Sequence, residues 1–457
     1  MRTFNTVAKR WEFVNSYGWE DQGKAWVEVM RGDQDNAVLL NTFDHEAGTY
    51  LGKGTVLQRD ISKMPVDPDS DAMNAWVKAW APFGPAGAWG GPSSLNTSAW
   101  GTQPIHMYVV DSTHPDTNWR TFGTASTAIQ TPSVEIDTYM RGKIAMPDWA
   151  VPAQNGDHGM SVYDVGTGIM REWFMCTQQP DGTWGGGGGY SVNTPGLMHL
   201  AQDNYGLQQR RGLSNVAGMH NSLGFIGIQE VLAGKIEHAL CVTFASSWSL
   251  TKTKDEVMTE YAAFQAAGKT PPVNWPDGPR RVSWPARGAD GKAERYIPES
   301  TWNMPGGTKN FTGDHRSPTH GQWGRLKANV DPMHNPKTGK PYPYLVRLAI
   351  EAAKKYGIVG TDTNLWTNAF NAEQGRTWKH YYGMDPWSPY NGGEGVIPKF
   401  AASQDAKYEG GLGGWETFPW DQMEWAPIDW GRPSPDTNLR PGQPVPWWSP
   451  ADPDNPL

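Results

Sequence analysis

Three carboxylates and one imidazole near the middle of the chain have the side-chain types that acid–base chemistry on a sugar bond requires. They are Asp157, Glu172, Glu230 and His238, all within residues 157–244. Carboxyl and imidazole groups exchange protons near neutral pH, and enzymes that cleave glycosidic bonds use two carboxyl groups roughly 5 to 9 Å apart. These four residues are therefore the catalytic candidates.

The first two candidates lie on an expected hairpin whose strands cover residues 158–164 and 169–175. In the simplest register Ser161 faces Glu172, and alternation puts Asp157 on the same face as Glu172. The two carboxylates are then about four residues apart along the strands, or roughly 13 Å at ~3.3 Å per residue. The hairpin alone does not supply a catalytic pair, so the segment that holds Glu230 and His238 must complete it.

Glu230 and His238 each have a structural alternative. We expect Glu230 in a loop that enters a strand within residues 234–244, where it could act as an acid or base; alternatively it is a helix-turn or surface charge. His238 borders the apolar run of that strand. It is then either a catalytic imidazole or a hydrogen-bonded structural histidine.

Aromatic residues provide candidate sugar-stacking surfaces. Trp184 precedes five glycines, residues 185–189, and Tyr190 follows them. Five glycines cannot form a packed strand interior, so we expect a loop. Trp184, Tyr190 and Trp284 are the candidates for glycan binding, with a surface loop of no binding role as the alternative for the glycine run. The run is not followed by the Lys-Ser/Thr pair of a phosphate-binding loop.

Composition indicates the fold class. The chain has 53 Gly and 37 Pro but only 38% apolar residues, which is typical of short strands joined by turns. We therefore expect a mainly β fold, with a sandwich or jelly-roll-like core and a few helices. Apolar stripes predict helices over residues 69–81 and 344–356. Strand patterns cover residues 106–111, 134–139 and 324–331.

A chain of 457 residues is too long for one ordinary core. A Gly-, Pro- and Ser-rich stretch ends the first region, so we divide the chain into an N-terminal region (1–101), a β-rich central domain (102–383) and a Gly-, Trp- and Pro-rich C-terminal extension (384–457). The proline-rich tail over residues 427–457 is expected to lie extended along a partner or another part of the chain.

Charge and motif content argue against several classes of protein. The net charge is −8 without a basic run, which disfavours nucleic-acid binding. No apolar stretch is long enough for a membrane span, and the N-terminus lacks the apolar core of a secretory signal. The two cysteines, Cys176 and Cys241, do not make a disulfide framework, and the sequence leaves their pairing open. No zinc or EF-hand spacing occurs, so no cofactor is predicted, although loop aspartates leave a Ca²⁺ site open.

An ordered series of segments covers roughly residues 104–365. They are residues 104–111, Asp157-His158, Tyr163-Asp164, Thr167-Gly168, Glu172, Ala217-Gly218, Glu230, residues 234–240, Trp284-Pro285-Ala286-Arg287, Ile297-Pro298-Glu299 and residues 355–362. The series resembles a poorly characterised family of secreted actinobacterial proteins, and similar domains occur in minor tail proteins of phages that infect actinobacteria. The sequence departs from the family pattern at Met170-Arg171-Glu172, where the family has Leu-Tyr-Glu, at residues 219–223, where it has a Pro-rich segment, and at Ser300, where it has Gly.

The resemblance implies a minor tail protein at the tip of a phage tail, made in the host cytoplasm without a signal peptide and assembled in several copies with other tail proteins. Its partner would be host cell-envelope glycan. Two alternatives stay open: a glycoside hydrolase that degrades the envelope polysaccharide, and a structural tail component without glycan activity. The hydrolase requires two of the candidate carboxylates to meet in a cleft, and the structural component leaves them apart and solvated.

Overall fold

The computed structural model describes a discontinuous set of segments that together form layered sheets and helices. Strands dominate, the sheets are mixed, and helices are few, so the expected mainly β class is confirmed. The described residues are 2–5, 10–13, 56–80, 93–96, 106–123, 141–153, 158–164, 167, 169–173, 176–185, 191–193, 215, 217, 219, 221–244, 259, 262–263, 266–269, 283–286, 318–363, 368–382, 387, 415–428 and 430–431.

The largest sheet has six strands. Its centre is the parallel pair β12–β14, and antiparallel partners flank this pair on both sides. In spatial order the strands are β16 (Met423–Trp425), β13 (Trp323–Leu326), β14 (Ile358–Thr363), β12 (Leu240–Phe244), β15 (Asn368–Asn371) and β3 (Ser93–Asn96).

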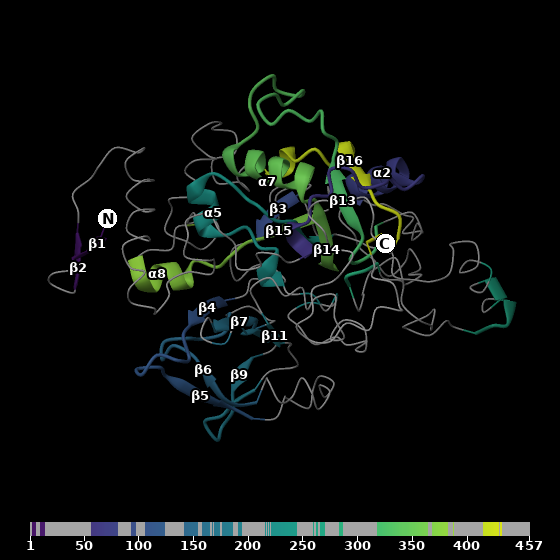
Figure 1. Ribbon diagram of the computed structural model, residues 1–457. Helices are drawn as coiled ribbons and strands as arrows, with labels where there is room; N and C mark the ends of the chain where they lie inside the picture. The colour runs from purple at the N-terminus through teal and green to yellow at the C-terminus, as the bar shows by residue number, and fades with distance from the viewer. Residues whose placement is uncertain are drawn as a thin grey trace.

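Helices cover one face of this sheet (Figure 1). α7 (Tyr344–Lys355) packs its apolar stripe on β12 and β13, and α2 (Ser70–Trp80) packs against β16. The short α5 (Ile228–Ala233) joins the same core. The helices predicted over residues 69–81 and 344–356 are therefore confirmed.

A four-stranded sheet lies on the other side of the six-stranded sheet (Figure 1). It contains the predicted hairpin in the predicted register, with Ser161 opposite Glu172. The strand expected over residues 106–111 is also confirmed, and it pairs in parallel with the hairpin. The strands are, in order, β11 (Ser191–Asn193), β8 (Ile169–Trp173), β7 (Met160–Asp164) and β4 (His106–Val110).

The two sheets share a buried core. Because side chains alternate along a strand, Met107 and Val109 of β4 face this core while Tyr108 and Val110 face away. Val359 of β14 contributes from the six-stranded sheet. The parallel pairs β4–β7, β12–β14 and β15–β3 depart from the antiparallel pairing of a jelly roll.

A third sheet, also of four strands, packs on the face of the β11–β8–β7–β4 sheet that points away from the six-stranded sheet (Figure 1). Phe122 and Trp173 stack there with ring centroids 4.8 Å apart. Its strands are β6 (Gly142–Ala145), β5 (Trp119–Phe122), β10 (Trp184–Gly185) and β9 (Thr177–Gln178). The remaining elements are the pair β1 (Arg2–Asn5) and β2 (Arg10–Phe13), α8 (Arg376–Tyr382), and the 3₁₀ turns η1 (Val56–Gln58), η3 (Asn221–Leu223), η8 (Trp415–Thr417) and η9 (Trp420–Gln422).

The six-stranded sheet takes strands from all three regions defined from the sequence. β3 comes from residues 1–101 and β16 from residues 384–457, and both are edge strands of the same sheet. The strand expected over residues 324–331 is shorter and ends at Leu326. The strand expected over residues 134–139 and the tail beyond residue 431 lie outside the described residues.

Two further sequence questions are answered by the fold. Cys176 and Cys241 are separate, buried free thiols, and burial raises the pKa of each. Within the described part of the chain, no helix combines the length and apolar character needed to cross a membrane.

Candidate functional site

Glu172 lies in the core between the six-stranded sheet and the β11–β8–β7–β4 sheet. Its Oε2 accepts hydrogen bonds from the Ser222 backbone N–H at 3.2 Å and from Ser222 Oγ at 2.7 Å. Ser161 Oγ lies 3.4 Å from Ser222 Oγ, so the predicted cross-strand neighbour belongs to the same polar cluster. Glu172 is 0% exposed. A ligand in solvent does not reach this carboxylate in the observed conformation.

Glu230 is in helix α5, and the expectation that it lies in a loop is wrong. Its Oε2 accepts the Gly227 backbone N–H at 3.0 Å and lies 3.0 Å from His238 Nε2. The carboxylate therefore closes the first turn of α5 and pairs with the imidazole. This explains why a short six-residue helix persists here.

His238 contacts an acceptor with each ring nitrogen. Nδ1 lies 2.8 Å from the Ala239 carbonyl oxygen, while Nε2 faces the Glu230 carboxyl group. Nδ1 must donate to the carbonyl, and a second proton must lie between Nε2 and Oε2. Both side chains are 0% exposed. The pair connects α5 to the start of β12, which corresponds to the structural alternative for His238.

The predicted stacking tryptophans are buried as well. Trp184 belongs to strand β10 and is 9% exposed, with the Arg120 guanidinium 4.5 Å from its ring centroid. Trp284 is 6% exposed in the core between the sheets. Neither ring offers a face to a sugar. Asp157 and Tyr190 lie outside the described residues.

An open cavity of about 290 Å³ lies at the β4 edge of the β11–β8–β7–β4 sheet. The β4–β5 connection, the segment after β6, and α8 surround it. We call it the histidine pocket. Its lining residues are Val110, Asp111, His114, Asp116, Thr117, Asn118, Met146, Pro147, Asp148, Trp149 and His380.

One wall of the histidine pocket consists of stacked rings. His380 lies parallel to Trp149, with centroids 3.8 Å apart and planes at 10°. Tyr108 meets Trp149 edge-on at 5.1 Å and is anchored by a 2.6 Å hydrogen bond to the Val151 carbonyl oxygen. Burial raises the pKa of Tyr108 to about 12, so its hydroxyl stays protonated and keeps this anchor at neutral pH.

The β4–β5 connection contributes oxygen and nitrogen atoms held by local hydrogen bonds to the lining. Asp111 Oδ1 accepts the Thr113 N–H at 2.9 Å and Thr113 Oγ1 at 2.6 Å. The Asp116 N–H points at His114 Nδ1, 3.2 Å away, so a neutral His114 carries its proton on Nε2. These contacts fix the turn and hold the polar groups in place for a ligand.

The charge of the pocket is set by its aspartates. Asp111, Asp116 and Asp148 line it, and no lysine or arginine is among the lining residues that the structure describes. Burial lowers the pKa of His380, and nearby Asp148 only partly opposes this shift. His380 is therefore neutral at pH 7, and the pocket is acceptor-rich and net negative.

These features suit a small hydroxyl-rich molecule. Sugar hydroxyls donate to carboxylates, and the C–H face of a sugar ring packs on an aromatic surface. Across the described segments, no group of three or more His, Cys, Asp or Glu side chains is arranged to hold a metal ion.

Sequence reasoning missed this pocket for a definable reason. Asp148 and Trp149 follow strand β6, but His380 lies in a helix more than 200 residues later, and nothing in local spacing connects them. No protein-family model, curated protein or solved structure matches this chain.

Proposed function

We propose that the protein binds host cell-envelope glycan as a minor tail component at the tip of a phage tail, with the histidine pocket as its sugar-binding site. The observation that carries the proposal is the combination of a ring wall, Trp149 and His380, with the carboxylates of Asp116 and Asp148 in one open cavity. A sugar placed there packs on a ring and donates its hydroxyls to the carboxylates.

The charge of the pocket favours a neutral sugar over an acidic one. Three aspartates repel carboxylate- or phosphate-bearing sugars but accept hydroxyl protons. A volume of about 290 Å³ is near the lower end for small-molecule sites. The pocket therefore suits one or two sugar units of a longer chain, and several copies in a tail would raise the overall affinity.

The assignment to a tail rests on the resemblance of residues 104–365 to tail-protein domains. The layered sheets suit this role, because sheets packed face to face can hold an edge pocket in fixed geometry. Other tail proteins would be the partners inside the particle, and the glycan would be the partner outside it.

The buried candidates do not favour the hydrolase alternative, and its third carboxylate, Asp157, lies outside the described residues. Glu172, Glu230 and His238 are 0% exposed and belong to structural hydrogen-bonding clusters. The structural-component alternative expected solvated carboxylates; Glu172 and Glu230 are instead buried, and their structural hydrogen bonds are compatible with that alternative. We propose binding without cleavage because the open histidine pocket combines a ring wall with carboxylate acceptors.

The test is co-sedimentation of purified protein with purified actinobacterial cell wall. The Asp116→Asn, Asp148→Asn double variant keeps the shape of the pocket but removes two charged acceptors, so its affinity should fall by about tenfold or more. Asp71→Asn on the exposed face of α2 is the matched control and should bind normally. Absence of wall binding by the unaltered protein, or equal binding by the double variant, would refute the proposal.

The particle assignment has its own readout. Mass spectrometry of purified phage particles should detect the chain in several copies. Failure to find it in particles would refute the tail assignment and leave glycan binding to stand separately.

A further inference from the structure

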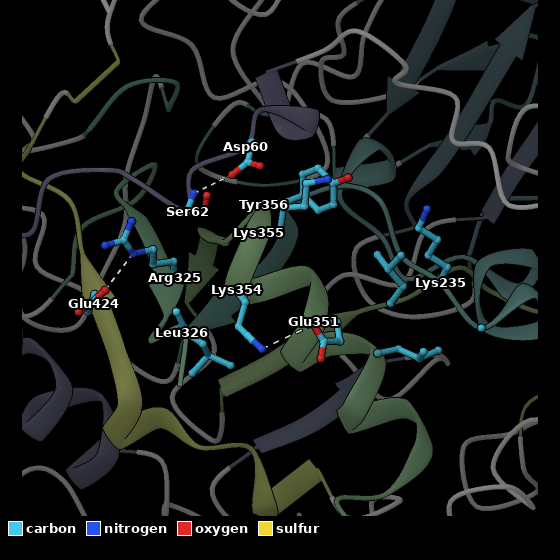
Figure 2. A pocket seen from close by; sticks show the side chains of 14 residues that line it. Asp60, Ser62, Lys235, Arg325, Leu326, Glu351, Lys354, Lys355, Tyr356 and Glu424 are labelled. Carbon is cyan, nitrogen blue, oxygen red and sulfur yellow. Dashed lines mark hydrogen bonds and ion pairs between the residues drawn. The ribbon is translucent and has the colours of Figure 1, made fainter. Parts of the chain in front are cut away.

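A second, larger cavity of about 740 Å³ lies on the helix side of the protein, away from the aspartates of the histidine pocket. It is bounded by the segment after η1, the α5–β12 connection, β13, β16 and the C-terminal half of α7 (Figure 2). Leu326 and Leu348 are buried beneath it. We call it the lysine groove.

Cations from three separate segments line this groove. Lys235 comes from the α5–β12 connection, Arg325 from β13, and Lys354 and Lys355 from the last turn of α7 (Figure 2). The lining carboxylates are Asp60, Glu351 and Glu424, so the cations outnumber them by one. The protein as a whole has a net charge of −8. Lys235 also contacts Glu237, so the four cations have four acidic neighbours, and the groove gathers cations on an acidic protein without a net positive charge.

Arg325 is the fixed cation of the groove. Its Nε pairs with Glu424 Oε2 at 2.9 Å, and Nη1 donates to the Ile61 carbonyl oxygen at 3.0 Å. These bonds connect β13 to β16 and to the segment after η1, while Nη2 makes no hydrogen bond to the residues described. An arginine held in this way can present its remaining N–H groups to an oxyanion with little loss of conformational freedom.

The lysines pair with carboxylates at partly exposed positions. Lys354 Nζ lies 3.7 Å from Glu351, whose side chain is 58% exposed, and the Lys235 side chain is 67% exposed where it meets Glu237. Solvent-exposed pairs of this kind contribute little to stability, so an incoming anion can replace the carboxylate partner. Lys355 lies with its Nζ 5.0 Å from the Tyr356 ring centroid, and its hydrogen bond with Tyr356 is the largest influence that raises its pKa.

We propose that the lysine groove binds an oxyanion-bearing ligand, a phosphate or carboxylate group, through Arg325, Lys354 and Lys355, with Lys235 at the rim. Leu326 and Leu348 would contact the apolar part of the same ligand. This site has the opposite charge preference to the histidine pocket. Its ligand class is therefore separate from the neutral sugar, and the inference does not rest on the glycan proposal.

The test is calorimetric titration with three probes: inorganic phosphate, glucuronate and glucose. We expect saturable binding of at least one anion, affinity that falls as ionic strength rises, and no binding of glucose to this groove. Binding of phosphate alone identifies the oxyanion as phosphate, and binding of glucuronate alone identifies it as carboxylate. Absence of saturable binding for both anions overturns the proposal.

Variants locate the bound anion. Lys354→Gln, Lys355→Gln should weaken binding by about tenfold or more, whereas the exposed pair Lys337→Gln, Lys340→Gln should leave it unchanged. If the Lys354→Gln, Lys355→Gln variant folds poorly, the exposed Lys235→Gln variant provides a second test. It should weaken anion binding about threefold or more. Equal affinity of the groove variants and the control pair would show that the anion binds elsewhere. Glycan binding at the histidine pocket should be unaffected by all of these changes.

Discussion

At the scale of single residues, the buried polar side chains act as structural connections. Glu172 attaches the hairpin to the η3 turn through Ser222, and Glu230 attaches α5 to the start of β12 through His238. Acid–base chemistry needs the same residue types as these connections do. The sequence singled out these polar residues as catalytic candidates, but it could not distinguish a buried pair from a catalytic one, because burial depends on how the sheets stack.

Substitution of Glu230 by glutamine tests this structural role. The change removes the charge that faces His238 in the core, so the free energy of unfolding should fall by about 3 kcal/mol. Urea denaturation measures this loss, and Glu351→Gln on the exposed side of α7 should change stability by less than about 0.5 kcal/mol. An unchanged unfolding midpoint for Glu230→Gln would contradict the structural role.

His106 predicts a pH dependence of stability. Burial lowers its pKa from 6.5 to about 4, although Nδ1–H donates to the Val151 carbonyl oxygen at 2.7 Å. The unfolded chain therefore binds this proton more tightly than the folded chain. Stability from this group is complete above pH 6.5 and is lost as the pH falls toward about 4, by about 3 kcal/mol in total.

His106→Gln should flatten that dependence. Its amide can donate to the same carbonyl but does not titrate, so the difference between the two proteins isolates the imidazole. Unfolding free energies measured from about pH 4 to pH 7 provide the comparison, with the exposed His334→Gln as control. Parallel curves for the unaltered protein and His106→Gln would show that His106 does not cause the effect.

At the scale of elements, local sequence patterns predicted the features that depend on residues close in the sequence, namely strand register and helices. The hairpin register and both long helices follow from alternation and apolar stripes. Glu230 was misplaced because a six-residue helix has too few turns to show a stripe. The burial of Trp184 was not foreseen, because its strand has only two residues and is fixed by pairing with β5 and β9.

Gly357 shows how one position fixes the turn between α7 and β14. Its φ is +82°, and a Cβ there would lie 2.3 Å from Ile61 Cδ1 and 2.6 Å from the Gly324 carbonyl oxygen. Gly357→Ala should therefore destabilise the fold by about 3 kcal/mol or more, from backbone strain and overpacking together. Thermal or urea unfolding measures this loss.

Gly339 is the matched control for that substitution. Its φ is +68°, but a Cβ added at this glycine would have no neighbouring atom within 4 Å. Gly339→Ala therefore retains only the backbone cost of about 1 kcal/mol. A similar loss for both variants would show that crowding at Gly357 contributes nothing.

At the scale of the whole molecule, segments far apart in sequence share one sheet. Trp425 of β16 is fully buried, packs against Phe244 at 5.9 Å between ring centroids, and donates from Nε1 to Asn74 Oδ1 at 2.8 Å. It thus joins the C-terminal region to β12 and α2. The composition-based division into three regions could not anticipate this, because strand pairing between such distant segments leaves no local signal.

Trp425→Ala should destabilise the central sheet by about 3–5 kcal/mol in a single cooperative transition. Calorimetry would show one unfolding peak at a lower temperature. Trp119→Ala, at a position that is 49% exposed, serves as the control and should shift the peak little. If Trp425→Ala instead removed a separate minor unfolding peak and left the main transition unchanged, the C-terminal segment would fold independently of the central sheet.

Two cavities on one layered scaffold, one lined by aspartates without a cation and one in which four cations meet, form the basis of the proposed functions. The sugar is expected in the histidine pocket, and the oxyanion in the lysine groove. Both cavities depend on elements that are distant in sequence, so neither was predictable from motif spacing.

The most direct test of glycan binding is a crystal structure of the protein with a neutral oligosaccharide released from actinobacterial cell wall. We predict a sugar ring in the histidine pocket, against the Trp149–His380 wall and within hydrogen-bonding distance of Asp116 or Asp148. A sugar bound only in the lysine groove or elsewhere on the surface, with the histidine pocket empty, would contradict the proposal.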